Sequence, residues 1–203
     1  LTVIQGMAYL IRTDQDQWSE TGTQKIKANS GILLQMINQM LGIAKIDEGA
    51  MTVNPVRRDV NKYIASVVEL FESEALKRKI DLSFFSAENP FEMDFDTDKL
   101  MHIITNLISN ALKFTSEGGS VNVSTSVTDN GNSFSIRVKD TGIGIEKEHL
   151  SHLFDRFYQV KSVSSSGGTG LGLAYVKEMV ALLNGRISLE SIPENYLKQP
   201  INS

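Results

Sequence analysis

The chain has 203 residues, of which 41% are hydrophobic and 22% charged, a balance that predicts one or two globular domains and disfavours disorder. Its net charge of -4 offers no basic surface for nucleic acid, and no apolar run approaches the roughly 20 residues of a membrane-spanning helix. Because cysteine is absent, disulfides and thiolate metal sites are excluded, which is compatible with a reducing cytoplasm.

The N-terminal part of the chain predicts a helical hairpin. Residues 1 to 12 carry apolar side chains at helical spacing, and the polar stretch from 13 to 20 is expected to turn the chain back. A long helix is expected from 20 to 48, where apolar residues alternate three and four positions apart as in a coiled-coil seam. These seam residues are Ile26, Leu33, Ile37, Met40 and Ala44, and Ser30 fills the missing step between Ile26 and Leu33.

Two helices bury only one stripe against each other, so we expect a second copy of the hairpin to complete a four-helix bundle in a homodimer. The alternative is that the hairpin packs on the rest of its own chain. A domain boundary is expected near residue 50, which divides the chain into residues 1–50 and 51–203. The segment Val53-Asn54-Pro55 reads as an extended linker, because the residue before a proline disfavours helix.

Beyond the boundary, helices and strands are expected to alternate and to form a two-layer α/β sandwich. The expected elements are a helix over 59 to 78, a strand over 80 to 85, a helix over 98 to 114 capped by Asp96 or Thr97, strands over 121 to 127 and 134 to 138 joined by a hairpin turn at 129 to 132, a helix over about 171 to 184, and the strand RISLES over 186 to 191.

Three polar residues of the helix at 98 to 114 are spaced to project from one face. Asn106, Asn110 and Lys113 stand at i, i+4 and i+7, and the opposite face is apolar. An amide oxygen is a suitable ligand for Mg2+, and a lysine ammonium neutralises phosphate as a point charge. The pattern indicates a phosphate or nucleotide site, although an ordinary solvated helix face has the same spacing.

The segment DTGIGI, residues 140 to 145, directly follows a predicted strand. Asp140 therefore stands at a strand end, where ligand sites of α/β folds gather, and two glycines after it permit close backbone approach. A carboxylate here can accept a hydrogen bond from an exocyclic amine such as that of adenine. Asp-Thr-Gly is also the triplet of aspartic proteases, but these need a second carboxylate that only a dimer could supply. A plain strand-ending turn is the remaining alternative.

The segment GGTGLGL, residues 167 to 173, leads into a predicted helix. Its backbone amides can form a phosphate cradle, but it is neither a P-loop nor a Rossmann fingerprint. The preceding residues, 146 to 167, are rich in serine and charge and suit a mobile lid. In this lid Arg156 is a candidate phosphate clamp. The aromatic residues Phe154, Phe157 and Tyr158 are either anchors of the lid or ordinary packing residues.

Through these segments the chain resembles the catalytic core of a sensor histidine kinase of a bacterial two-component system, over essentially its whole length. TNLISNALKFT is similar to the N box of that family, DTGIGI and GGTGLGL to its two glycine boxes, LFDRFYQ to its F box, and LLQMINQMLGIAKIDEG to the second helix of its dimerisation hairpin.

The resemblance implies an α+β fold, in which the hairpin of a dimeric four-helix bundle precedes a two-layer ATP-binding domain of the Bergerat type. It implies ATP and Mg2+ as cofactors, with Asp140 reading adenine, Asn110 holding the metal, and Lys113 and Arg156 on the phosphates. Asn106, Lys113 and Arg156 are the catalytic residues it implies. The other cofactor-binding residues it implies are Asn106, Phe114, Gly142, Ile143, Gly144, Phe157, Gly168, Thr169, Gly170, Leu171 and Gly172.

Asn106 takes the place at which gyrases and mismatch-repair ATPases, related members of the superfamily, carry a glutamate that activates water. An amide cannot take a proton, so the site suits phosphate transfer to a protein acceptor better than hydrolysis. The resemblance therefore implies a protein-histidine kinase whose phosphoryl group is relayed to a response-regulator receiver domain, in the cytoplasmic part of a membrane-bound receptor. An ATP-hydrolysing machine and a nucleotide-gated, non-catalytic dimer module are the alternatives.

The acceptor histidine is expected upstream of Leu1. The family carries it in a motif like H-E-x-x-T-P-L, and the chain opens on Leu1-Thr2, as if cut after that proline. None of the three histidines, His102, His149 and His152, matches the acceptor position. At the other end, residues 192 to 203 differ from the last turn and strand of the family, which indicates either a sheet that lacks one strand or a truncation.

Overall fold

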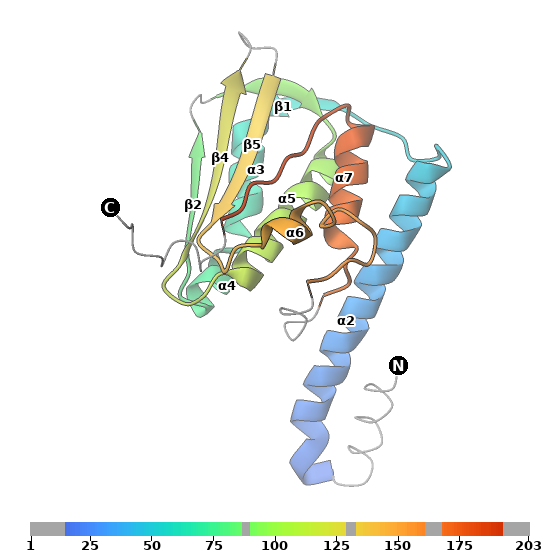
Figure 1. Ribbon diagram of the computed structural model, residues 1–203, viewed down its shortest axis with the longest axis vertical. Helices are drawn as coiled ribbons and strands as arrows, with labels where there is room; N and C mark the ends of the chain where they lie inside the picture. Colours follow the sequence, from blue (N-terminus) through green and yellow to red (C-terminus); the bar gives the residue numbers. More distant parts are fainter. Residues whose placement is uncertain (1–14, 87–89, 129–132, 161–167, 193–203) are drawn as a thin grey trace.

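The computed structural model describes residues 15–86, 90–128, 133–160 and 168–192 (Figure 1). Its helices are α2 (Gln15–Asp47), α3 (Val60–Glu69), α4 (Glu72–Lys77), α5 (Thr97–Phe114), α6 (Lys147–Leu150) and α7 (Gly172–Leu182). Its strands are β1 (Val56–Asp59), β2 (Asp81–Ser86), β3 (Glu92–Phe95), β4 (Ser120–Thr128) and β5 (Ser133–Asp140).

Strand β4 is the centre of the main sheet. It pairs in parallel with β2 and antiparallel with β5, while β1 and β3 form a separate antiparallel pair. Helices α3 and α5 pack on one face of the main sheet, and α7 lies beside α5 (Figure 1). The predicted α+β class, with a long N-terminal helix followed by a two-layer α/β domain, is confirmed.

The main core lies between this sheet and helices α3 and α5. Val121 and Val123 of β4 are fully buried in one cluster with Ile104, Ile108 and Leu112 of α5. Each such side chain contributes roughly 1.5–3 kcal/mol by leaving water. The apolar face of α5 is therefore fixed against the sheet, and its polar face is turned away from it.

The first turn of α5 is capped by Asp96, one of the two residues predicted to do so. The Asp96 Oδ1 atom accepts a hydrogen bond from the backbone N–H of Lys99 at 3.1 Å, and Thr97 is the first helical residue. The start of the helix is thereby fixed independently of its apolar face.

Helix α2 packs on α7 through its C-terminal half, and its other half extends away from the domain (Figure 1). Ile43 is buried in a second core cluster with Tyr175 and Met179 of α7. The two helices approach closely at Gly42, where an added Cβ would lie 2.5 Å from the Tyr175 Oη atom. Helix α2 therefore packs on the rest of its own chain, which was the predicted alternative to a bundle formed only with a second copy.

Three predicted elements differ from the structure. The polar stretch from 13 to 20 was expected to turn, but α2 already begins at Gln15, because glutamine and glutamate are good helix formers. The predicted helix over 59 to 78 is two helices, since the chain breaks at Leu70 and Phe71, where Phe71 packs on the core. RISLES was expected to be a strand, but residues 186 to 191 form no strand and pair with none.

Strands β1 and β3 were not predicted, because four residues are too few for a pattern of period two. The predicted helix over 1 to 12, the hairpin turn at 129 to 132 and the serine-rich part of the lid at 161 to 167 lie outside the described residues. The boundary near residue 50 stays a prediction, and it falls in the stretch between α2 and β1.

Candidate functional site

The polar face of α5 lies close to the glycine-rich loop. A Cβ added at Gly172 would lie 2.9 Å from the Asn106 Oδ1 atom and 4.0 Å from the Asn110 Nδ2 atom, and one added at Gly168 would lie 3.1 Å from the Lys113 Nζ atom. The loop approaches this closely because it lacks side chains there. Two amides and one ammonium group are thereby gathered beside the backbone of the glycine-rich loop.

Lys113 is half-buried, and its Nζ atom lies 4.7 Å from the centroid of the Phe114 ring. Burial lowers the pKa of Lys113 below its ordinary value, because the ammonium group has lost part of its hydration. A phosphate oxygen beside it would offset that loss. The lysine thus has the electrostatics of an anion-binding residue.

The DTGIGI loop closes the site at the C-terminal end of α5. Asp140 ends β5 with an exposed side chain whose Oδ1 atom accepts a hydrogen bond from the Gly142 N–H at 2.9 Å. The Ile143 N–H donates to the Phe114 carbonyl at 3.3 Å, and a Cβ at Gly142 would lie 2.6 Å from that same carbonyl oxygen. Gly144 adopts a positive φ of 68°, which favours glycine.

The F-box segment, residues 153 to 159, forms hydrogen bonds with backbone carbonyl groups of the glycine-rich loop. The Phe157 N–H donates to the Gly170 carbonyl at 2.9 Å, and a Cβ at Gly170, whose φ is +68°, would lie 2.6 Å from the Phe157 carbonyl carbon. The Gln159 side chain donates to the Gly168 carbonyl at 3.0 Å. Leu171 is buried in the second core cluster and anchors the end of the loop. All four motifs therefore meet around α5.

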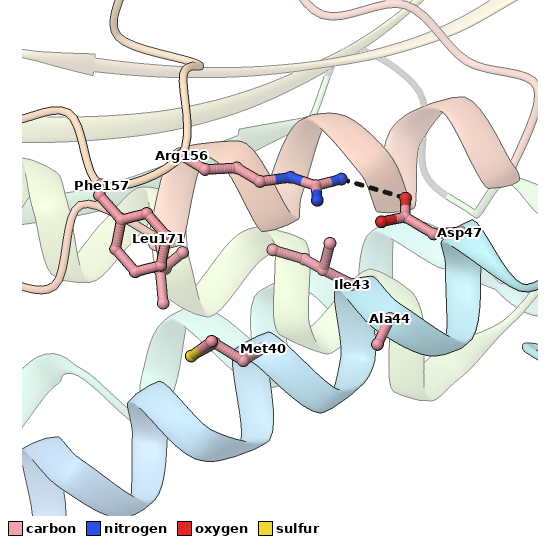
Figure 2. A pocket seen from close by; sticks show the side chains of 7 residues that line it. All are labelled: Met40, Ile43, Ala44, Asp47, Arg156, Phe157 and Leu171. Carbon is pink, nitrogen blue, oxygen red and sulfur yellow. Dashed lines mark hydrogen bonds and ion pairs between the residues drawn. The ribbon is translucent and has the colours of Figure 1, made fainter.

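Arg156 points to helix α2 and not to the polar face of α5. Its Nη2 atom donates to Asp47 Oδ1 at 3.0 Å and lies 3.7 Å from Glu178 Oε1 of α7. The pair with Asp47 borders a pocket between α2 and the F-box segment, which Figure 2 shows; this pocket is lined by Met40, Ile43, Ala44, Asp47, Arg156, Phe157 and Leu171. Contact between Arg156 and phosphate stays a prediction.

Two residues of α2 that contact the site were missed by sequence reasoning. Besides Asp47, Gln39 reaches the site: its Nε2 atom donates to Asn106 Oδ1 at 3.4 Å, and its Oε1 atom accepts from Thr169 Oγ1 at 3.3 Å. The signal available was weak. Gln39 and Asp47 stand at i and i+8 with Ile43 between them, a stripe beside the apolar seam that points to no particular partner.

The comparison with protein families identifies the fold of this site. Residues 95–198 match the family model described as histidine kinase-, DNA gyrase B-, and HSP90-like ATPase. The chain belongs to this family. Within it, the chain is the catalytic region of a sensor histidine kinase, and bacterial and hybrid histidine kinases are among its relatives.

Two curated relatives illustrate the match. Hybrid signal transduction histidine kinase D of Dictyostelium discoideum is 36% identical over 172 residues, which cover 82% of this chain and 11% of that protein. Sensor histidine kinase WalK of Bacillus subtilis is 33% identical over 162 residues, which cover 79% of this chain and 26% of WalK. The chain thus spans about a quarter or less of the length of these two relatives.

Solved structures show the same fold. Histidine kinase AdeS of Acinetobacter baumannii superposes with a TM-score of 0.78 at 20% identity, covering 95% of this chain and 88% of AdeS. Full-length ShkA in complex with AMPPNP has a TM-score of 0.71 at 26% identity, covering 90% of this chain and 38% of ShkA. ThkA in complex with the response regulator TrrA has a TM-score of 0.71 at 18% identity, covering 98% of this chain and 58% of ThkA.

The donor set of this site suits a nucleotide, because the Lys113 ammonium and the Asn106 and Asn110 amides lie together beside a glycine-rich loop. A metal ion would need phosphate and water as further ligands. In the described ranges, no group of three histidine or acidic side chains is placed to hold one, so Asn110 would contribute a single amide oxygen to a Mg2+ that phosphate oxygens also bind. In the same part of the chain, no helix is long and apolar enough to cross a membrane.

Proposed function

We propose that this chain is the catalytic core of a protein-histidine kinase, which binds Mg2+-ATP and transfers the γ-phosphoryl group to a histidine upstream of Leu1. The observation that carries the proposal is the position of Asn106. Its amide lies beneath the glycine-rich loop, at the place where hydrolytic relatives need a carboxylate, and it cannot abstract a proton from water. The complex of ShkA with AMPPNP supports an ATP-like ligand.

In the proposed reaction an imidazole nitrogen of the acceptor attacks the γ-phosphorus. A phosphorus–nitrogen bond forms, the bond to the oxygen that bridges the β- and γ-phosphates breaks, and ADP leaves with that electron pair, while the imidazole releases a proton to solvent. Lys113 and the backbone N–H groups of the loop stabilise the phosphate charge, Asn110 helps to hold Mg2+, and Asp140 orients the adenine. Catalysis is then positioning plus electrostatics.

The test uses radiolabelled ATP, Mg2+ and a chain that carries both this region and the acceptor histidine. We expect an acid-labile phosphoprotein that disappears in the Asp140→Asn variant, in which ATP binding by calorimetry is also lost. Asn106→Glu should raise phosphate release without acceptor. Rapid phosphate release by the unchanged protein, or the absence of phosphoprotein while ATP binds, would overturn the proposal.

The partners proposed for this kinase are a second copy of the chain and a response-regulator receiver domain. An exposed apolar stripe on α2 supports the homodimer. An aspartate of the receiver domain is the proposed acceptor when the phosphoryl group is relayed in the cytoplasm. The complex of ThkA with the response regulator TrrA supports a partner of this kind.

A further inference from the structure

Gln39 links the hairpin helix to two separate motifs of the ATP site. Although it lies on α2, its side chain is buried, with 4% of the residue exposed. One end of its amide donates to Asn106 on α5, and the other accepts from Thr169 in the glycine-rich loop, at 3.4 and 3.3 Å. A buried glutamine with both ends bonded is held in a single orientation.

The two bonds belong to a longer relay in which every donor points the same way. The Leu171 backbone N–H donates to Thr169 Oγ1 at 3.1 Å, the Thr169 hydroxyl donates to Gln39, and Gln39 donates to Asn106 Oδ1. At the far end, Asn106 Nδ2 donates to the His102 carbonyl at 2.9 Å. The relay fixes the Asn106 amide with its nitrogen on its own helix and its oxygen toward the loop.

The packing around Gln39 makes this link rigid. One turn further along α2, Ile43 is 4% exposed within the second core cluster, and Gly42 lets the Tyr175 ring lie against the helix. Two turns further along, Asp47 binds Arg156 of the F-box segment. The same face of α2 therefore contacts the N box, the second glycine box and the F box.

We propose that Gln39 is a positioning residue for phosphotransfer, a role that rests on the proposed function. It acts through Asn106 and Thr169: the relay points the Asn106 oxygen at the loop and ties the loop to the hairpin that the acceptor histidine precedes. When α2 packs on the ATP-binding domain, the Asn106 amide is therefore oriented at the same time. A glutamine that merely fills space would need no donor toward Asn106.

The test compares three variants in the chain that carries the acceptor. Gln39→Met and Gln39→Glu both keep the size of the side chain, but neither can donate to Asn106 Oδ1, and the glutamate places a carboxylate beside it. We expect both to lower kcat for phosphoryl transfer by roughly five- to tenfold, with a smaller change in KM for ATP. Gln35→Met, an exposed position one turn earlier on α2, should match the unchanged protein. Thermal unfolding of each variant verifies that it is folded.

A double-variant cycle tests the relay itself. Thr169→Val removes the hydroxyl and Thr169→Ser keeps it, so kcat for phosphoryl transfer should fall less in the serine variant. Combined with Gln39→Met, the Thr169→Val change should lower kcat by a smaller factor than it does alone. Normal kcat in Gln39→Glu, or fully multiplicative effects in the cycle, overturn the role of Gln39 while the kinase activity stands. Failure of the unchanged protein to bind ATP overturns the proposed function and this role together.

Discussion

Asp96 fixes the start of the helix that carries the site. Its carboxylate accepts hydrogen bonds from the backbone N–H groups of Lys99 at 3.1 Å and Asn54 at 2.8 Å, and it pairs with the Lys99 ammonium at 2.7 Å. Burial alone would raise the pKa of Asp96, but these bonds to Asn54 and Lys99 outweigh it and lower the pKa to about 2. The group therefore stays charged down to low pH.

We expect Asp96→Asn to destabilise the fold by about 2 kcal/mol near neutral pH, because it leaves the buried Lys99 without its counter-charge. A carboxyl whose folded pKa lies below its ordinary 3.8 stabilises fully above that value, and the stabilisation is lost as pH falls toward 2. Urea unfolding should thus show a smaller difference between variant and unchanged protein near pH 3. A difference that does not depend on pH would contradict this account.

Single residues were predictable where their partners are local. The cap at Asp96 and the shared face of Asn106, Asn110 and Lys113 follow from helix periodicity over a few residues. Arg156 shows the limit: its residue type predicted an anion partner, but its partner Asp47 lies 109 positions away and belongs to another element. Only the packing of α2 on α7 brings them together.

At the scale of elements, two of the glycines of α2, Gly31 and Gly42, have opposite surroundings. An added Cβ at Gly31 would meet nothing within 4 Å, whereas one at Gly42 would meet ring atoms of the buried Tyr175 at 2.6 Å. Helix propensity favours alanine at both positions by about 1 kcal/mol. Of these two positions, only Gly42 is packed so closely against α7 that the packing opposes a change to alanine.

We therefore expect Gly31→Ala to raise the free energy of unfolding by up to about 1 kcal/mol and Gly42→Ala to lower it by roughly 1–3 kcal/mol. The pair is matched, since the same change is made twice on one helix. Urea unfolding of both variants makes the comparison. Equal stabilisation by both would mean that α2 and α7 do not approach each other at Gly42.

The ion pair of Arg156 with Asp47 connects α2 to the F-box segment at the surface. Both side chains are about half exposed, so the pair adds little stability. If Arg156 also binds phosphate, Asp47 competes for it. We expect Asp47→Asn to tighten ATP binding roughly two- to fivefold with little change in thermal stability.

Glu48→Gln, the same change of charge at the next position, is the control, because Glu48 is exposed. Calorimetric titration with ATP measures both variants. Equal affinities in Asp47→Asn, Arg156→Gln and the unchanged protein would remove Arg156 from the list of phosphate ligands.

Elements were predicted well where a pattern repeats over many residues, as in α5, β4 and β5. The break between α3 and α4 was missed, because Phe71 continues the helical pattern of apolar residues and only the core shows that the chain turns there. RISLES alternates like a strand, yet pairing needs backbone partners that the alternation of side chains does not reveal.

At the scale of the whole molecule, α2 leaves a large apolar surface in contact with water. Leu34, Ile37 and Leu41 are 60%, 52% and 56% exposed, and Ile37 belongs to the seam predicted from the sequence. The buried face of α2, with Ile43, points instead to α7. An exposed apolar stripe on a helix of 33 residues favours association with a second copy.

We expect Ile37→Glu to weaken the dimer at least about tenfold, because each of two copies loses a buried aliphatic side chain and gains a charge in the seam. Sedimentation over a range of concentrations measures the dissociation constant, with Gln35→Glu as the control at an exposed polar position of the same helix. ATP affinity should be unchanged, because all four motifs of the pocket meet within one chain. An unchanged protein that stays monomeric at high concentration would instead mean that α2 serves only its own ATP domain.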